Sequence, residues 1–205
     1  MTPFRRLAPA LLAPVFLLGC NLVHPYPERA YYTLPAPEDA GAPALEAAST
    51  PIALAVPRAV VAPPYDTRSF QYRVADAGVE PAYYAQWAAD PGELIAGAVS
   101  RTLASSGVAI VPDEAAGAAR VRLLIEVADL SADVRTPGAP RAVITLRATL
   151  VDERGEILLH RTAGAAHDAA TAAPDDILTA WSAGLGEILE DLAPPLRTAV
   201  RSASK

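Results

Sequence analysis

A short serine motif is the first place in this 205-residue chain where chemistry could reside. Residues 180–184 read AWSAG, a relaxed form of the G-x-S-x-G nucleophile elbow centred on Ser182. That elbow needs a strand before the serine and a helix after it, because the sharp turn between them presents the hydroxyl group. Here the flanking residues follow a helical pattern on both sides, so we expect no catalytic role for Ser182.

The histidines and carboxylates also lack the spacing that catalysis or metal binding requires. His24, His160 and His167 do not fall at metal-ligand intervals on one element, and the chain's single cysteine is not spaced to join them as a metal ligand. His167 and Asp168 are adjacent, which does not orient an imidazole as a triad does. There is no glycine-rich phosphate loop. We therefore predict no catalytic residue, no metal and no cofactor, and a protein that is not an enzyme.

The single cysteine, Cys20, directly follows a stretch typical of a secretory signal peptide. Arg5 and Arg6 precede an apolar run at 7–18, which is shorter than the roughly 20 residues of a membrane span. The four residues at 17–20, LLGC, resemble a bacterial lipobox. This resemblance implies cleavage before Cys20 and attachment of lipid, including palmitate-type acyl chains, which would anchor the protein in a membrane. The alternative is an ordinary secreted protein with a stray thiol.

The residue after Cys20 bears on which membrane holds the anchor. Bacterial lipoproteins that stay in the inner membrane often carry aspartate there, whereas this chain has Asn21. By this resemblance, we expect an anchor in the outer membrane, facing the periplasm.

Composition limits the mature chain to one acidic domain. Removal of residues 1–19 leaves 186 residues with 15 basic and 23 acidic side chains, a formal charge of −8. The only lysine is Lys205, so nucleic acid is not an expected partner. Residues 35–51 are rich in proline and alanine and lack periodicity. We predict a signal peptide at 1–19, a lipidated tether and linker at 20–51, and a folded domain at 52–205.

Hydrophobic periodicity predicts an α+β domain, with a mainly antiparallel sheet and two helices packed on one face. The first strand, at 52–61, is broken by Pro57, and a strand at 70–74 is expected to pair antiparallel with it. Asp90 and Pro91 are typical of a helix start. The further expected elements are the helix at 90–106, strands at 108–111, 120–130, 143–151 and 156–163, and a helix from 174 that Pro194 and Pro195 should end.

Three aromatic residues, Tyr83, Tyr84 and Trp87, precede the first helix in a chain with only 6% aromatic residues. One interpretation is that they fix the start of the helix onto the sheet. The other is a patch that contacts a partner or lipid, since tyrosine and tryptophan supply amphipathic contact area. We expect Trp87 to lie mainly in the core, and Tyr83 or Tyr84 to be the exposed contact.

The series of motifs resembles the ABC-type transport auxiliary lipoproteins, the PqiC-like family. The features that carry the resemblance follow one another along nearly the whole chain. They are the lipobox at Cys20, Tyr31-Tyr32-Thr33-Leu34, the alternating strand Ile52, Leu54 and Val56, the segment from Pro64 to Arg73, the Tyr84, Trp87, Pro91 approach to the helix, the hairpin at 152–155 and the last helix.

This resemblance implies a non-catalytic lipoprotein that assists an ABC transporter by docking a periplasmic Mce-type protein. Such systems move phospholipids or other hydrophobic molecules between membranes. Two other classes stay open: an envelope assembly lipoprotein that supports a β-barrel, and a lipid-anchored hydrolase using Ser182.

Overall fold

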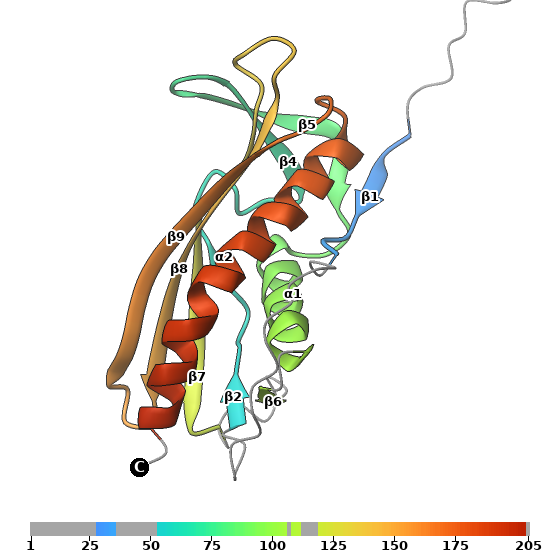
Figure 1. Cartoon of the computed structure of the whole chain (residues 1–205). Coiled ribbons are helices and arrows are strands. Elements are labelled where there is room, and N and C mark those ends of the chain that lie inside the picture. The colour runs from blue at the N-terminus through green and yellow to red at the C-terminus, as the bar shows by residue number, and fades with distance from the viewer. Residues whose placement is uncertain (1–27, 36–52, 106–107, 112–118, 204–205) are drawn as a thin grey trace, which may run out of the picture.

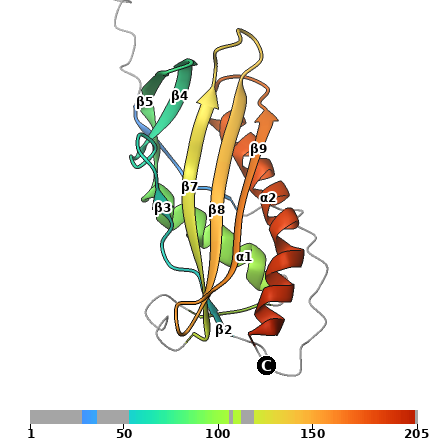
Figure 2. The ribbon, with the colours of Figure 1, turned by 90° about the vertical axis from the view of Figure 1, so that its left-hand side faces the viewer.

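A computed structural model of the chain describes residues 28–35, 53–105, 108–111 and 119–203. These residues form an α+β domain in which two helices cover one face of a nine-stranded mixed sheet (Figures 1 and 2). The predicted fold class is therefore confirmed. The predicted signal peptide, Cys20 and most of the linker lie outside the described residues, so the domain boundaries stay predictions.

The elements follow one another along the chain, with the longest strands in its second half. The helices are α1 (Pro91–Ser105) and α2 (Pro174–Ser202). The strands are β1 (Ala30–Tyr32), β2 (Ala53–Ala55), β3 (Val60–Val61), β4 (Ser69–Ala75), β5 (Gly78–Trp87), β6 (Ala109–Val111), β7 (Val121–Asp133), β8 (Arg141–Asp152) and β9 (Ile157–Asp168).

Strand β7 is the centre of the sheet. Its first edge pairs with β8 along its whole length, and β8 pairs in turn with β9, both antiparallel. Its second edge is shared end to end by β2, β3 and β4, which all run parallel to it. The prediction that residues 70–74 pair antiparallel with the first strand is therefore wrong. Because β2, β3 and β4 occupy successive lengths of one edge, they do not lie side by side.

Strand β5 was not expected from the sequence. It pairs antiparallel with β4, and the register passes from Ser69 opposite Gln86 to Gln71 opposite Pro81. A step of two residues along β4 thus corresponds to a step of five residues along β5, so β5 contains a large bulge at this point. Pro81 has no N–H to donate, so it fits an interrupted ladder of this kind. The bulge removes the strict alternation by which a strand is recognised in a sequence.

The long hairpins and the first helix confirm the predicted patterns. On β8, Ile144, Leu146, Ala148 and Leu150 are all buried, as expected from their period of two. The turn after β8 places Gly155 at φ +82°, a conformation that suits glycine. At the start of α1, Asp90 Oδ1 accepts hydrogen bonds from the backbone N–H groups of Gly92 and Glu93.

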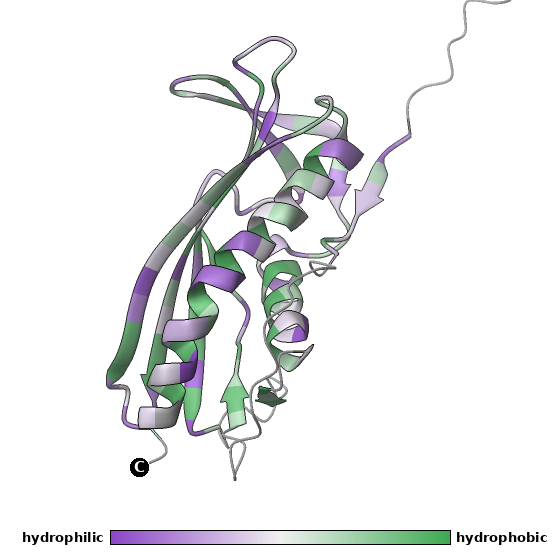
Figure 3. Ribbon diagram, viewed as in Figure 1, coloured by the Kyte–Doolittle hydropathy of each residue, from purple (hydrophilic) through white to green (hydrophobic). Residues whose placement is uncertain are grey.

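Helix α2 crosses β8 and β9 diagonally, with hydrophilic and hydrophobic residues alternating along it (Figures 1 and 3). The predicted stripe of Ile177, Trp181, Leu185, Ile188 and Leu192 is buried. The prediction that Pro194 and Pro195 end the helix is wrong, since α2 continues to Ser202. Each proline leaves one carbonyl without a helical partner, those of Glu190 and Asp191. Both residues are exposed, so water can bind these carbonyls, while the buried Leu196 keeps the last turns packed.

Aromatic rings from three elements form the middle of the core. The Phe70 ring of β4 lies with its centroid 4.3 Å from Trp87 and 5.1 Å from Trp181 of α2. The indole Nε1–H of Trp181 donates to the carbonyl oxygens of Val143, at 3.0 Å, and Ser131, at 3.3 Å. The helix is thereby attached to both central strands through one fully buried side chain.

Candidate functional site

Trp87 is the last residue of β5, and its side chain is buried beneath the sheet edge formed by β1 and β5. Its side chain is only 2% exposed, and its ring centroid lies 5.3 Å from that of Trp181. Its backbone N–H donates to the carbonyl of Arg68 at 2.6 Å. The ring therefore belongs to the core and has almost no surface to offer a partner.

The two tyrosines before it lie in the bulge of β5, near the surface. Tyr83 is 60% exposed, and Tyr84 is half-buried. Their ring centroids lie 4.9 Å apart in an edge-to-face arrangement with an interplanar angle of 77°. The guanidinium carbon of Arg29 lies 5.2 Å from the centroid of the Tyr83 ring, which is within the range of a cation–π contact.

Strand β1 adds a further exposed tyrosine to the same edge. It pairs parallel with β5, with Tyr31 opposite Gln86 and Tyr32 opposite Trp87. Neighbouring residues of a strand point to opposite faces: Tyr31 is 60% exposed, whereas Tyr32 is half-buried with its ring 5.2 Å from Phe70. Burial, together with the nearby charge of Asp175, raises the pKa of Tyr32.

We call Arg29, Tyr31, Tyr83 and Tyr84 the tyrosine edge. Sequence reasoning singled out the two tyrosines of β5 but missed Arg29 and Tyr31. The contact between Arg29 and Tyr83 depends on the parallel pairing of strands more than fifty residues apart in the chain. No local sequence pattern predicts the pairing of two strands so far apart in the chain. The sequence offered the run Tyr31-Tyr32-Thr33-Leu34, which carries part of the family resemblance but does not reveal the partner of this strand.

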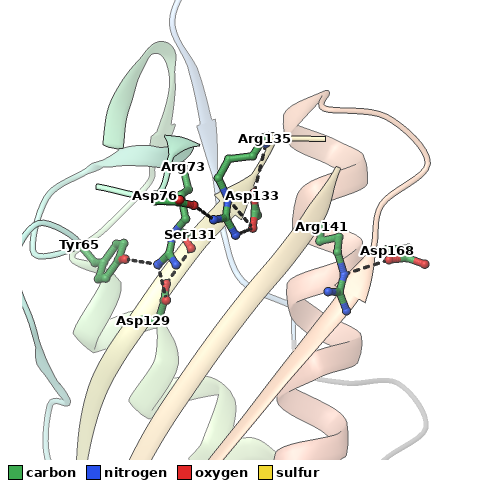
Figure 4. A network of polar contacts seen from close by, with 9 residues as sticks. All are labelled: Tyr65, Arg73, Asp76, Asp129, Ser131, Asp133, Arg135, Arg141 and Asp168. Atoms are coloured by element: carbon green, nitrogen blue, oxygen red, sulfur yellow. Dashed lines mark hydrogen bonds and ion pairs between the residues drawn. The ribbon is translucent and has the colours of Figure 1, made fainter. Parts of the chain in front are cut away.

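A network of charged side chains lies between β4, β7, β8 and β9 (Figure 4). Arg73 donates to Asp129 at 2.6 Å and to the Tyr65 hydroxyl at 2.9 Å, and Ser131 donates to the other oxygen of Asp129 at 2.7 Å. Arg135 pairs with Asp133 and with Asp76. The hydrogen bonds that Arg135 donates to Asp133 hold the pKa of Asp133 below its ordinary value. Each of these charges is matched by an opposite charge, so the network fastens β4 to β7 and presents no unpaired acid or base.

Ser182 lies inside α2, directly after the buried Trp181, and not at a turn between a strand and a helix. The two described histidines have separate partners. His167 Nε2 lies 2.8 Å from Glu187 Oε2, and His160 Nδ1 lies 2.9 Å from Thr149 Oγ1. His24 and Cys20 lie outside the described residues.

The described part of the chain contains no group of three or more histidine, cysteine, aspartate or glutamate side chains that could hold a metal ion. An apolar hollow lined by Leu34, Trp87, Pro91, Leu94, Ile95 and Leu130 leaves no space for even a water molecule. Pockets for small molecules usually have about 300–1,000 Å³, so this hollow cannot hold a lipid.

Neither helix in the described ranges is long and apolar enough to cross a membrane.

Comparison with known structures shows the same fold in two solved proteins. A protein from Xanthomonas campestris, assigned to a domain family of unknown function, superposes with a TM-score of 0.66 at 18% sequence identity, covering 86% of this chain and 97% of that one. A second, uncharacterized protein gives a TM-score of 0.64 at 15% identity, covering 82% of this chain and 99% of the other. A search of curated protein sequences gave no match.

The family comparison is more specific than the structural one. Residues 32–193 match the model of a family described as the ABC-type transport auxiliary lipoprotein component. The match runs from the end of β1 to the two prolines of α2 and so includes almost the whole described domain. The chain therefore belongs to the ABC-type transport auxiliary lipoprotein family, as its motifs predicted.

Proposed function

We propose that this chain is a non-catalytic, lipid-anchored component of an ABC transporter that works with a periplasmic Mce-type protein. Acyl chains on Cys20 hold it at the periplasmic face of the outer membrane. The transporter moves phospholipid or another hydrophobic substrate between the two membranes. The observation that carries this proposal is the family match over residues 32–193 in a chain whose Cys20 follows a lipobox-like sequence.

The side chains of the described domain support an auxiliary role without chemistry. Among them, every buried side-chain nitrogen and oxygen has a hydrogen-bond partner, so no buried polar group is left unpaired for a substrate to bind. The hollow beside Trp87 has space for neither an acyl chain nor a headgroup. On this proposal, the ATPase supplies the energy, the Mce-type protein carries the substrate, and this chain supplies an anchored docking surface.

The tyrosine edge is the surface we propose for contact with a partner, which is either a protein or lipid. Tyr83 and Tyr84 are its proposed contacts, whereas Trp87 supports the edge from inside the core. Tyrosine and arginine are enriched at protein interfaces and also at the headgroup layer of membranes. The composition of the edge therefore suits either a protein or a lipid occupant.

Co-purification tests the proposed function. The acylated chain would be produced with a permease, an ATPase and an Mce-type protein from the same organism, and then captured in mild detergent. We expect the Mce-type protein to be recovered with it, and Ser182→Ala to leave both recovery and lipid transport unchanged. Recovery of an outer-membrane β-barrel in place of the Mce-type protein would favour the envelope assembly class. Esterase activity that disappears in Ser182→Ala would favour the hydrolase.

A further inference from the structure

We propose that the tyrosine edge rests on the lipid headgroup layer of the membrane that holds Cys20, and so fixes the orientation of the domain. This inference rests on the proposed lipid anchor, and it assigns the edge a lipid occupant. The surface consists of Arg29, Tyr31 and Tyr83, with Tyr84 beneath them.

The first argument is the length of chain between the anchor and this edge. Arg29 follows Cys20 by nine residues, so its Cα lies at most about 30 Å away when the chain is fully extended. The described chain begins at Glu28 and enters the sheet directly as β1, the strand at the end of the strand order. The tyrosine edge is consequently the part of the described domain with the shortest path to the membrane surface.

The second argument is the chemistry of the exposed side chains. Tyr31 and Tyr83 are both 60% exposed, although each ring is apolar over most of its area. At a membrane, such rings lie at the headgroup level, with the ring among the upper acyl segments and the hydroxyl in water. Arg29, placed over the face of Tyr83, can direct its guanidinium to lipid phosphates while its methylene groups stay on apolar surface.

The third argument concerns the kind of lipid. Arg29 is accompanied by the exposed Glu28 beside it, and the exposed Glu80 lies three residues before Tyr83 on β5, so the edge is not a basic patch. Attraction to anionic lipid requires clustered basic residues. The edge is suited to zwitterionic headgroups such as phosphatidylethanolamine, which offer both a phosphate for Arg29 and an ammonium for the carboxylates. Contact of this kind should depend only weakly on salt, because burial of the tyrosine rings is not screened and the charges of the edge largely cancel.

Site-directed spin labels test this orientation in the acylated protein. Acylation occupies the sulfur of Cys20, so Tyr31→Cys and Tyr83→Cys each provide one labelling site. Ile157→Cys is the matched control, because Ile157 is a comparably exposed apolar residue, at 66%, on β9 at the other end of the sheet. In phosphatidylethanolamine-rich vesicles we expect labels at 31 and 83 to collide with a water-soluble nickel complex about threefold less than the label at 157.

A second measurement uses the wild-type sequence and does not depend on the folding of any variant. A phosphatidylethanolamine carrying a photoreactive group near its headgroup should label peptides from β1 and β5 but not from β9. Equal nickel accessibility at 31, 83 and 157, or equal photolabelling of β9, would overturn the inference. Protection at 31 and 83 that requires the Mce-type protein would overturn it too, because the occupant would then be a protein.

The mass of the purified protein separates this inference from the proposed function. If the protein is acylated but the labels at positions 31 and 83 are accessible to water, the proposed orientation is refuted and the proposed anchored function is not. An unmodified Cys20 would refute the anchor, and the orientation with it.

Discussion

Trp87 and Tyr83 are four residues apart on one strand, yet Trp87 is buried in the core and Tyr83 is exposed at the surface. Trp87 is enclosed by Phe70 and Trp181, whereas Tyr83 contacts Arg29 and Tyr84 near the surface. Truncation of a buried tryptophan usually removes about 3–5 kcal/mol of stability. We expect Trp87→Ala to lose an amount in this range, and Tyr83→Ala to lose less than about 1 kcal/mol.

Urea unfolding of both variants, followed by circular dichroism, measures this difference. A Trp87→Ala protein that unfolds at the wild-type midpoint would show that the aromatic cluster contributes little. In that case, the proposed division between core and surface residues on β5 would have to be abandoned.

Asp90 combines two functions at the start of α1. Its Oδ1 caps the helix, and both of its oxygens accept hydrogen bonds from Arg58, at 2.9 and 2.7 Å. The bonds from Arg58, with those from the helix N–H groups, hold the pKa of Asp90 below its ordinary value. A lowered pKa in the folded state means that the carboxylate stabilises the fold above the unfolded pKa of about 3.9. This stabilisation is lost as the pH falls through the folded value.

Two substitutions separate the cap from the ion pair. Asparagine caps a helix about as well as aspartate, so Asp90→Asn should cost only the partly exposed ion pair, about 0–1 kcal/mol. Asp90→Ala should lose the cap as well, about 1 kcal/mol more. The stability difference between wild type and Asp90→Asn should shrink between pH 5 and pH 3, as urea midpoints would show. A difference that stays constant over this range would exclude the assigned charge effect.

At the scale of elements, one glycine sets how closely α1 approaches β3. An ideal Cβ at position 92 would lie 2.2 Å from the carbonyl oxygen of Ala59, whose N–H donates to the Gly92 carbonyl at 3.2 Å. Gly92→Ala therefore requires the backbone to move apart, and we expect a loss of more than about 1 kcal/mol. At Gly97, in the same helix, the nearest atom to such a Cβ is the mobile end of Arg101, at 3.3 Å.

Gly97→Ala is the matched control, because alanine favours a helix interior over glycine by about 1 kcal/mol. Thermal unfolding should thus move in opposite directions for the two variants, down for Gly92→Ala and up or unchanged for Gly97→Ala. Similar shifts for both would mean that helix propensity, and not contact with β3, determines the requirement for glycine.

The elements that the sequence revealed are those whose signals are local. The alternation in β7 and β8, the Asp90 cap and the stripe of α2 each depend on residues close together in the chain, and they confirm the predicted elements. The bulged β5 and the parallel placement of β2, β3 and β4 depend on distant partners. For the same reason, the aromatic cluster before α1 was noticed as unusual, while its contact with Arg29 was not foreseen.

At the scale of the whole molecule, the proposed lipid on Cys20 would determine where the domain is located. If Cys20 carries lipid, Cys20→Ser should move the protein from the membrane fraction to the soluble periplasmic fraction, because two or three acyl chains bind far more strongly than exposed tyrosines do. Fractionation with palmitate labelling measures this change. A variant that still sediments with outer membranes and still incorporates palmitate would show that the lipobox interpretation is wrong.

The last prediction concerns how the tether is joined to the domain. Between Cys20 and β2, the chain first docks at β1, where the buried Leu34 enters the core and its carbonyl accepts a hydrogen bond from Arg101 at 3.2 Å. The Ala88 N–H also donates to the Tyr32 carbonyl at 2.7 Å. If a protease site is inserted within residues 38–48 and cut, the anchored peptide holds the domain through these contacts, the pairing of β1 with β5 and the packing of Tyr32 on Phe70.

Leu34→Ser should weaken that attachment without affecting the uncut protein's hold on the membrane. Loss of one buried leucine side chain corresponds to about 1.5–3 kcal/mol, so the cut variant should be released from vesicles at least about tenfold faster than the cut wild type. Thr33→Ala is the matched control, because the Thr33 side chain precedes Leu34 directly and is exposed. Sedimentation at successive times after cleavage gives the three rates. Equal release of the wild type and Leu34→Ser would mean that β1 does not attach the tether to the domain. The tether would then extend from Cys20 to β2.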